Sequence, residues 1–99
     1  MRDPELDELK REFLAEALEK VQEIETSLDG DETRRDRVAY LAHQLKGSGG
    51  SYGYQRISSV AAELEKMAEQ AGDPTAMKGH AASLRSEIVA GERELATSG

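Results

Sequence analysis

The sequence contains no cysteine and no tryptophan, and only 4% of its 99 residues are aromatic. Without cysteine the chain forms neither a disulfide nor a thiolate metal site. With so few aromatic residues, its core has to consist mainly of aliphatic side chains. No apolar run approaches the roughly 20 residues that cross a bilayer, and the acidic, polar N-terminus is unlike a signal peptide. We therefore expect a cytoplasmic protein without membrane contact.

Basic charge is also scarce, because 13 lysine and arginine residues face 20 aspartate and glutamate residues, a formal net charge of -7. Nucleic-acid binding needs a clustered basic face that neutralises phosphates. The two basic pairs, Lys10-Arg11 and Arg34-Arg35, both lie among acidic residues. We expect no nucleic-acid partner.

What the sequence does contain is helical periodicity. Four segments carry apolar residues at intervals of three and four positions, which is typical of helices with one apolar face. The patterns predict helices over residues 4–29, 33–51, 54–71 and 74–96. Two of these helices begin with Asp-Pro, at Asp3-Pro4 and Asp73-Pro74, which suits an N-cap followed by the first helical position.

The apolar stripe of the first segment is the longest. It consists of Leu6, Leu9, Phe13, Ala17, Val21, Ile24 and Leu28. No segment alternates with period two over a useful length, so we predict no sheet. Four one-stripe helices joined by short breaks favour an all-α fold, an antiparallel up-down-up-down four-helix bundle. We expect residues 1–99 to form this single domain, as a monomer.

A histidine in the second segment is predicted to face water. His43 lies two residues after Leu41 and two before Leu45, so its side chain is about 200° from the first leucine and about 160° from the second. A lone histidine is often a satisfied core residue. Here the two leucines define the buried stripe, and the spacing favours an imidazole that points away from the core.

Small residues surround this histidine along the helix axis. Gly47 and Gly50 follow it by four and seven residues, and Ala39 precedes it by four, so all three are expected within about 40° of its direction. Lys46 lies one turn away, where its ammonium group can reach the space above the ring. The sequence thus predicts an exposed imidazole, a bare stretch of main chain and one nearby cation.

Glycine inside a helix costs about 1 kcal/mol relative to alanine. Bare backbone at Gly47 allows another macromolecule to approach closely, which is a common use of glycine. One alternative is that Gly49, Gly50 and Gly53 simply end the helix and form the turn. Another is that the glycines pack against a second helix of the bundle, although Gly47 faces the wrong way for that.

The exposed histidine has three possible chemical roles. A metal site needs three or four convergent ligands, and the only other histidine, His80, sits at the edge of the fourth apolar stripe, as expected of a boundary residue. A general base needs a pocket, which a solvent-facing helix does not offer. A neutral imidazole is a good nucleophile for phosphorus, and Lys46 can stabilise the charge of a phosphoryl group.

The stretch "AHQLKGSGGSYG", residues 42–53, resembles the histidine phosphotransfer (HPt) signature A-H-x-L-K-G-S/A-x-x-x-x-G. The upstream stretch "EFLAEALEKVQEIETSL" is similar to the first helix of the HPt domains that begin chemotaxis-type kinases. The resemblance covers nearly the whole chain. It implies a four-helix bundle in which His43 accepts a phosphoryl group from a sensor histidine kinase and exchanges it with an aspartate of a response-regulator receiver domain.

By this resemblance Lys46 stabilises the phosphoryl charge and Gly47 provides clearance. In the chemotaxis-type relatives a carboxylate on the third helix holds the other imidazole nitrogen, and Glu65 stands at the matching offset; an ordinary solvated acid is the alternative. Those relatives often have a histidine three residues earlier, where this chain has Ala62. The resemblance implies no intrinsic cofactor or metal, with Mg2+ expected only on the receiver.

Partner docking is expected over Ala39, Tyr40, Gly47 and Gly50, with Tyr40 one turn before the histidine. The stretch "GSGG" lacks the preceding strand and the Lys-Ser/Thr pair of a phosphate-binding loop. We therefore expect a covalently modified phosphocarrier and not an autonomous kinase. Two alternatives are an interaction module that binds a receiver or kinase without carrying phosphate, and a purely structural bundle.

Overall fold

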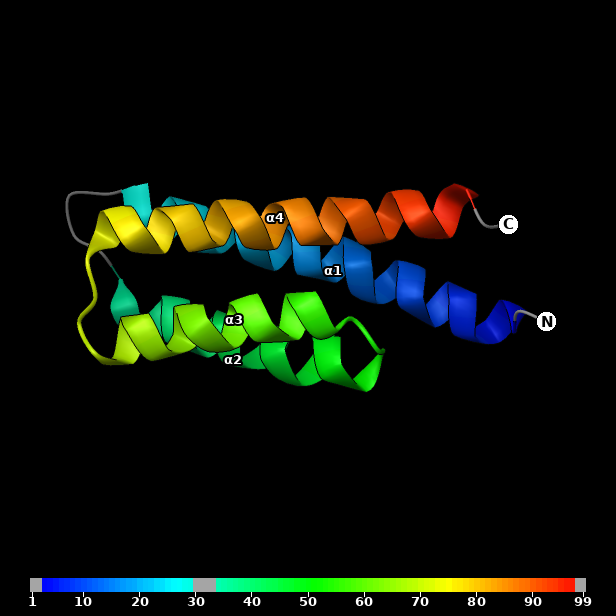
Figure 1. Cartoon of the computed structure of the whole chain (residues 1–99), viewed down its shortest axis with the longest axis horizontal. Coiled ribbons are helices and arrows are strands. Elements are labelled where there is room, and N and C mark those ends of the chain that lie inside the picture. Colours follow the sequence, from blue (N-terminus) through cyan, green and yellow to red (C-terminus); the bar gives the residue numbers. More distant parts are fainter. Residues whose placement is uncertain (1–2, 30–33, 98–99) are drawn as a thin grey trace.

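A computed structural model describes residues 3–29 and 34–97. The helices are α1 (Pro4–Asp29), α2 (Arg35–Ser51), α3 (Gln55–Glu69) and α4 (Pro74–Thr97). They run alternately in opposite directions (Figure 1), which confirms the predicted all-α four-helix bundle. The third helix ends two residues earlier than predicted, and the predicted start of the second at residue 33 lies outside the described residues.

The Asp-Pro sequences begin helices as expected. The Asp3 carboxylate accepts a hydrogen bond of 2.9 Å from the backbone N–H of Glu5, which otherwise lacks a partner within the helix. Pro4 occupies the first helical position, where its missing N–H costs nothing. At the start of α4 the Asp73 carbonyl accepts the first helical hydrogen bond, from Met77 N–H at 3.0 Å.

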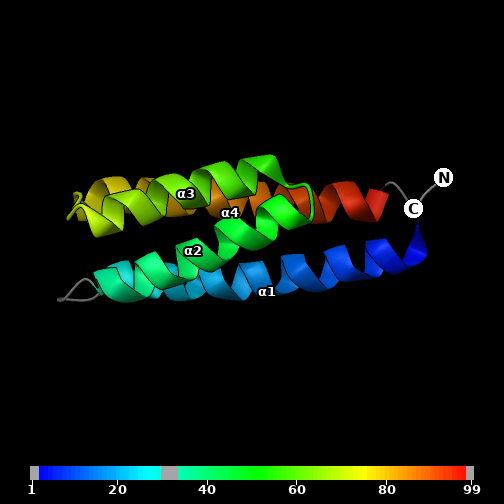
Figure 2. The same ribbon diagram turned by 90° about the horizontal axis from the view of Figure 1, so that it is seen from below.

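The helices form a ring in which α1 packs on α2, α2 on α3, α3 on α4 and α4 on α1. Seen from below, α2 lies between α1 and α3, inclined to both (Figure 2). The turn between α2 and α3 contains Gly53, whose φ of 83° is the left-handed conformation that favours glycine. Because α2 lies between α1 and α3, one side of it packs toward α1 and the other toward α3, and its remaining face is open.

The core is aliphatic, as the composition requires. Among the described residues no buried side chain is polar or charged. The buried apolar residues are Phe13, Leu14, Ala17, Val21, Ile24, Leu28, Val38, Leu41, Ala42, Leu45, Ile57, Ala61, Leu64, Ala68, Met77, Ala81, Leu84, Ile88 and Leu95. No described helix is both long and apolar enough to cross a membrane.

The prediction was wrong at the beginning of the first stripe. Leu6 and Leu9 are 41% and 46% exposed, whereas Leu14, which the stripe omitted, is fully buried. The reason is length: α1 has 26 residues and α4 has 24, but α2 has 17 and α3 has 15. The first turns of α1 and the last turns of α4 extend beyond the α2–α3 turn (Figure 1), so no second layer covers these leucines.

Three of the four aromatic residues cluster at the α2–α3 turn. The Phe13 ring on α1 stacks on Tyr52 and Tyr54, with centroid distances of 5.2 and 5.8 Å. Such pairs contribute about 1 kcal/mol each beyond burial. They hold the turn against α1 and so fix the end of α2 beyond His43.

Candidate functional site

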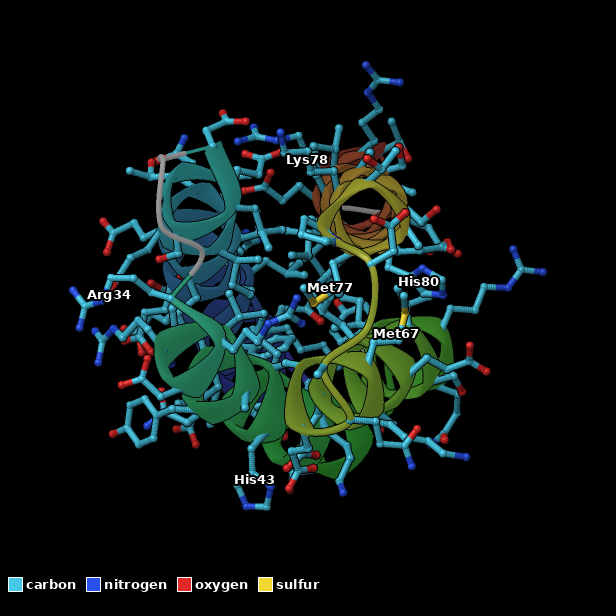
Figure 3. The ribbon with its side chains drawn as sticks, turned by 90° about the vertical axis from the view of Figure 1, so that its left-hand side faces the viewer. Arg34, His43, Met67, Met77, Lys78 and His80 are labelled. Atoms are coloured by element: carbon cyan, nitrogen blue, oxygen red, sulfur yellow. The ribbon has the colours of Figure 1, made fainter. Side chains whose placement is uncertain are left out.

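The open face of α2 carries the candidate site. Its exposed positions recur at intervals of three and four residues, and we call them the outer stripe: Asp36, Tyr40, His43, Gly47 and Gly50. The side chain of His43 is 66% exposed and projects from α2 away from the bundle (Figure 3). The predicted orientation of the imidazole is confirmed.

A carboxylate from α3 meets the ring from the side. Glu65 Oε2 lies 2.9 Å from His43 Nδ1, and the Glu65 side chain is only 16% exposed. Because a carboxylate only accepts hydrogen bonds, this contact assigns the proton to Nδ1 in the neutral imidazole. The lone pair is then on Nε2, the ring nitrogen not engaged by Glu65.

The same carboxylate also meets the predicted cation. Lys46 Nζ lies 3.3 Å from Glu65 Oε1, and its side chain is 44% exposed. The histidine and the lysine thus share one acid, each through a different oxygen. The structure brings together all three side chains that the sequence singled out for chemistry, His43, Lys46 and Glu65, and Glu65 is not simply solvated.

A family model described as the Hpt domain matches residues 8–93. The chain belongs to the Hpt domain family. The match includes the whole of α2 and α3 and most of α1 and α4. Hpt domains are phosphocarriers, not enzymes, that interact with kinases and response regulators in phosphorelays. A comparison with curated proteins and with solved structures finds no match.

The glycines of this Hpt domain differ in what surrounds them. A Cβ built on Gly47 would meet no atom within 4 Å, whereas one on Gly49 would lie 3.1 Å from the backbone nitrogen of Ser58 and 3.2 Å from Ile57 Cγ2. Gly49 therefore does not end the helix; it lets α2 and α3 pack closely. Gly53 does form the turn.

A hydrogen bond reinforces this close packing. Ser58 Oγ on α3 donates to the backbone carbonyl of Lys46 at 2.9 Å. A Cβ built on Gly50 would lie 3.6 Å from the same hydroxyl oxygen. Ser58 precedes Glu65 by seven residues, so both lie on the same face of α3. Ser58 is not among the residues predicted from the sequence, although its spacing from Glu65 is a usable signal.

Three of the four predicted docking residues, Tyr40, Gly47 and Gly50, belong to the exposed outer stripe, and Ala39 does not. Tyr40 is 53% exposed, but Ala39 is partly buried and packs against the core. The expected place of Ala39 on the open face was wrong because its direction, about 40° from His43 on the Lys46 side, turns it toward α3, and its part in docking stays a prediction. The open surface therefore consists of Tyr40, Gly47 and Gly50 around the imidazole.

The second histidine of the Hpt domain is a boundary residue, as predicted. His80 Nδ1 donates to the Ala76 carbonyl at 3.1 Å, and Nε2 lies 3.4 Å from Glu63 Oε2. It lies between α4 and α3, on a different side of the bundle from His43 (Figure 3). Across residues 3–29 and 34–97, no group of three or more side chains is placed to hold a metal ion.

Proposed function

We propose that His43 accepts a phosphoryl group on Nε2 and exchanges it with an aspartate of a response-regulator receiver domain, with a sensor histidine kinase as the other partner. One observation carries the proposal. The ring is two-thirds exposed while its Nδ1 is held by Glu65 at 2.9 Å. This arrangement fixes the tautomer and leaves the nucleophilic nitrogen accessible.

In the proposed step, the Nε2 lone pair attacks the phosphorus of an aspartyl phosphate. The N–P bond forms as the P–O bond to aspartate breaks, and the aspartate carboxylate leaves with the bonding electron pair. The ring then carries both the Nδ1 proton and the phosphoryl group, and hence a formal positive charge. Glu65 stabilises this charge, as the orienting carboxylate does in a Ser-His-Asp triad. No proton has to be removed, so transfer in the reverse direction needs no base.

Lys46 serves the phosphoryl group in this proposal. Its ammonium group rests on Glu65 Oε1 at 3.3 Å and lies one turn from the imidazole. When the phosphoryl group arrives, the flexible lysine side chain can turn toward the new oxygens, and the resulting charge-assisted contacts neutralise their charge. Glu65 is then left to the ring alone.

The remaining needs of the reaction fall to the partner. Phosphoryl transfer depends on positioning and on neutralising charge, and we assign Mg2+ to the receiver domain, with no cofactor on this chain. The chain acts as a phosphocarrier, in the cytoplasm and as a monomer. Gly47 and Gly50 let the receiver bring its aspartate close to the main chain of α2.

The test is direct labelling with phosphoramidate, a small donor that phosphorylates accessible imidazole without docking. We expect one phosphoryl group per chain, stable in base and lost in acid, as a phosphoramidate bond is. His43→Gln abolishes the label, and His80→Gln serves as the matched control that retains it. Acid-stable label, or label that survives His43→Gln, contradicts the proposal. Receiver binding without any labelling would favour the phosphate-free interaction module.

A further inference from the structure

The outer stripe of α2 is uneven. On the C-terminal side of His43 it consists of Gly47 and Gly50, which present almost no side chain. On the N-terminal side, Tyr40 presents a ring that is 53% exposed. Apart from Leu6 and Leu9 at the far end of α1, Tyr40 is the one large apolar residue exposed on the described part of the chain.

This tyrosine is held from two sides. Gln44 Nε2 donates a hydrogen bond of 2.9 Å to the Tyr40 hydroxyl, and the Arg37 guanidinium lies over the ring, 5.4 Å from its centroid. Arg37 is in turn held by an ion pair with Glu23 of α1. The ring is therefore ordered before any partner arrives, which lowers the entropy that binding has to offset.

A partner that reaches His43 has to cover Tyr40. The two residues are one helical turn apart, about 5 Å along the axis. A specific interface buries about 800 Å² on each partner, so it extends well beyond one turn from its centre. Exposed aromatic side chains that become buried near the centre of an interface dominate binding in many complexes.

We propose that Tyr40 is the specificity-determining contact of this chain for its receiver domain. This inference rests on the proposed function. The receiver it fits has an apolar depression beside its phosphorylated aspartate, with a hydrogen-bond acceptor at the far end. The acceptor follows from Gln44, because a hydroxyl that already accepts one hydrogen bond still has its proton to donate. Arg37 is paired with Glu23 and lies over one face of the ring.

The experiment separates docking from chemistry. The chain is loaded with phosphoramidate, freed of the donor, and mixed with increasing concentrations of each receiver domain of its organism in the presence of Mg2+. For Tyr40→Ala we expect loading of His43 at the wild-type rate. With the receiver that wild-type chain serves fastest, the half-saturating concentration rises about 30-fold, as for an interface hot spot, while the maximal rate is kept.

Matched variants assign the effect. Leu9→Ala truncates another exposed apolar residue, remote from His43, and leaves transfer unchanged. Tyr40→Phe and Gln44→Ala keep the ring but lose the hydroxyl or its partner, and we expect intermediate losses with both. The preference for the fastest receiver over slower ones decreases most in Tyr40→Ala and less in Tyr40→Phe and Gln44→Ala.

The outcomes are distinguishable. If Tyr40→Ala transfers phosphoryl groups as wild type does, or if its half-saturating concentration rises equally with every receiver, the inference is overturned and the proposed function stays intact. Failure of wild-type chain to load on His43 overturns the proposed function itself. Circular dichroism checks the fold of each variant, and Gln44→Ala tests the inference with Tyr40 still in place if Tyr40→Ala is unfolded.

Discussion

At the scale of the residue, three glycines within one turn of α2 meet three different surroundings. Gly47 faces open space, Gly49 faces the backbone of α3, and Gly50 lies beside the Ser58 hydroxyl. The same residue type thus provides close helix packing at one position and a bare surface two residues earlier. Substitution with alanine separates these two uses, because it adds one methyl group in each place.

Gly47→Ala is expected to stabilise the fold and impair transfer. Alanine is about 1 kcal/mol better than glycine in a helix interior, and no atom lies within 4 Å of the new Cβ. The free energy of unfolding, measured with urea, therefore rises by about this amount. Phosphoryl transfer to a receiver slows, because the methyl group stands where the partner approaches. Unchanged transfer would show that the bare surface is not used.

Gly49→Ala is expected to act in the opposite direction on stability. Its Cβ would lie 3.1 Å from the Ser58 backbone nitrogen, so α3 has to move away from α2. Overpacking of this kind costs about 1–3 kcal/mol against a gain of about 1 kcal/mol in helix propensity, so we expect the free energy of unfolding to fall by up to about 2 kcal/mol. Urea unfolding of the two alanine variants side by side makes the comparison, and a stabilised Gly49→Ala variant would contradict the close packing of α2 on α3 at Gly49.

Glu65→Gln is expected to slow loading of His43 by phosphoramidate. A carboxamide can donate to Nδ1, which favours the tautomer with its proton on Nε2 and removes the nucleophilic lone pair. Misplacement of a reacting group costs on the order of 100-fold in rate. Glu63→Gln, which changes the carboxylate beside His80, is the matched control and should load normally. Equal loading by both variants would mean that Glu65 does not orient the ring.

At the scale of the element, ion pairs connect neighbouring helices. Glu23 of α1 pairs with Arg37 of α2, and Arg85 of α4 binds Glu25 of α1 through Nε at 3.2 and 3.1 Å. The hydrogen bond from Arg37, more than its charge, holds the pKa of Glu23 below its ordinary value of 4.5. This pair also supports the Tyr40 ring, so it links the α1–α2 packing to the docking surface.

Stability should depend on Glu23 in a defined pH range. Because the pKa of Glu23 is lowered in the folded state, its contribution is complete above the unfolded value of about 4.5 and is lost as the pH falls through the folded value. We expect wild type to have a higher Tm than Glu23→Gln at pH 6, and the difference to shrink as the pH falls below 4.5. A difference that stays constant as the pH falls below 4.5 would contradict the assignment.

The sequence predicted the helices well because one physical signal, the spacing of apolar residues, determines which face of each helix is buried. It placed His43 correctly for the same reason, since Leu41 and Leu45 bracket it. It could not place Leu6 and Leu9, because their exposure depends on where α2 and α3 end. Periodicity describes one helix at a time and contains no information about the length of its neighbours.

The candidate site was predictable only in part. His43, Lys46 and Gly47 are local in sequence, and the resemblance to the family added Glu65. The supporting contacts depend on how helices cross: Ser58 on the Lys46 carbonyl, α3 against Gly49, and Arg37 between Glu23 and Tyr40. Ala39 shows the limit clearly, because the angle that placed it near His43 did not indicate which side of α2 meets α3.

At the scale of the whole molecule, the bundle is long and narrow, with extents of 47 × 19 × 16 Å. The four helices pack together over only part of the length of the two long helices, α1 and α4. Beyond the α2–α3 turn, α1 and α4 continue as a pair, and apolar residues there keep core spacing without core burial. The aromatic cluster of Phe13, Tyr52 and Tyr54 lies next to this boundary and closes the end of the core.

Because α2 and α3 end at this point, truncating a leucine side chain of α1 to alanine should cost much more stability on one side of it than on the other. Leu14 is fully buried, and Leu14→Ala should lower the free energy of unfolding by about 2–5 kcal/mol, as for other core leucines. Leu9→Ala lies little more than one turn earlier, where 46% exposure leaves less area to lose, and should cost under about 1 kcal/mol. Urea unfolding of both variants makes the comparison. A large cost at Leu9 would mean that it is covered in solution, and hence that another surface packs on the exposed end of α1.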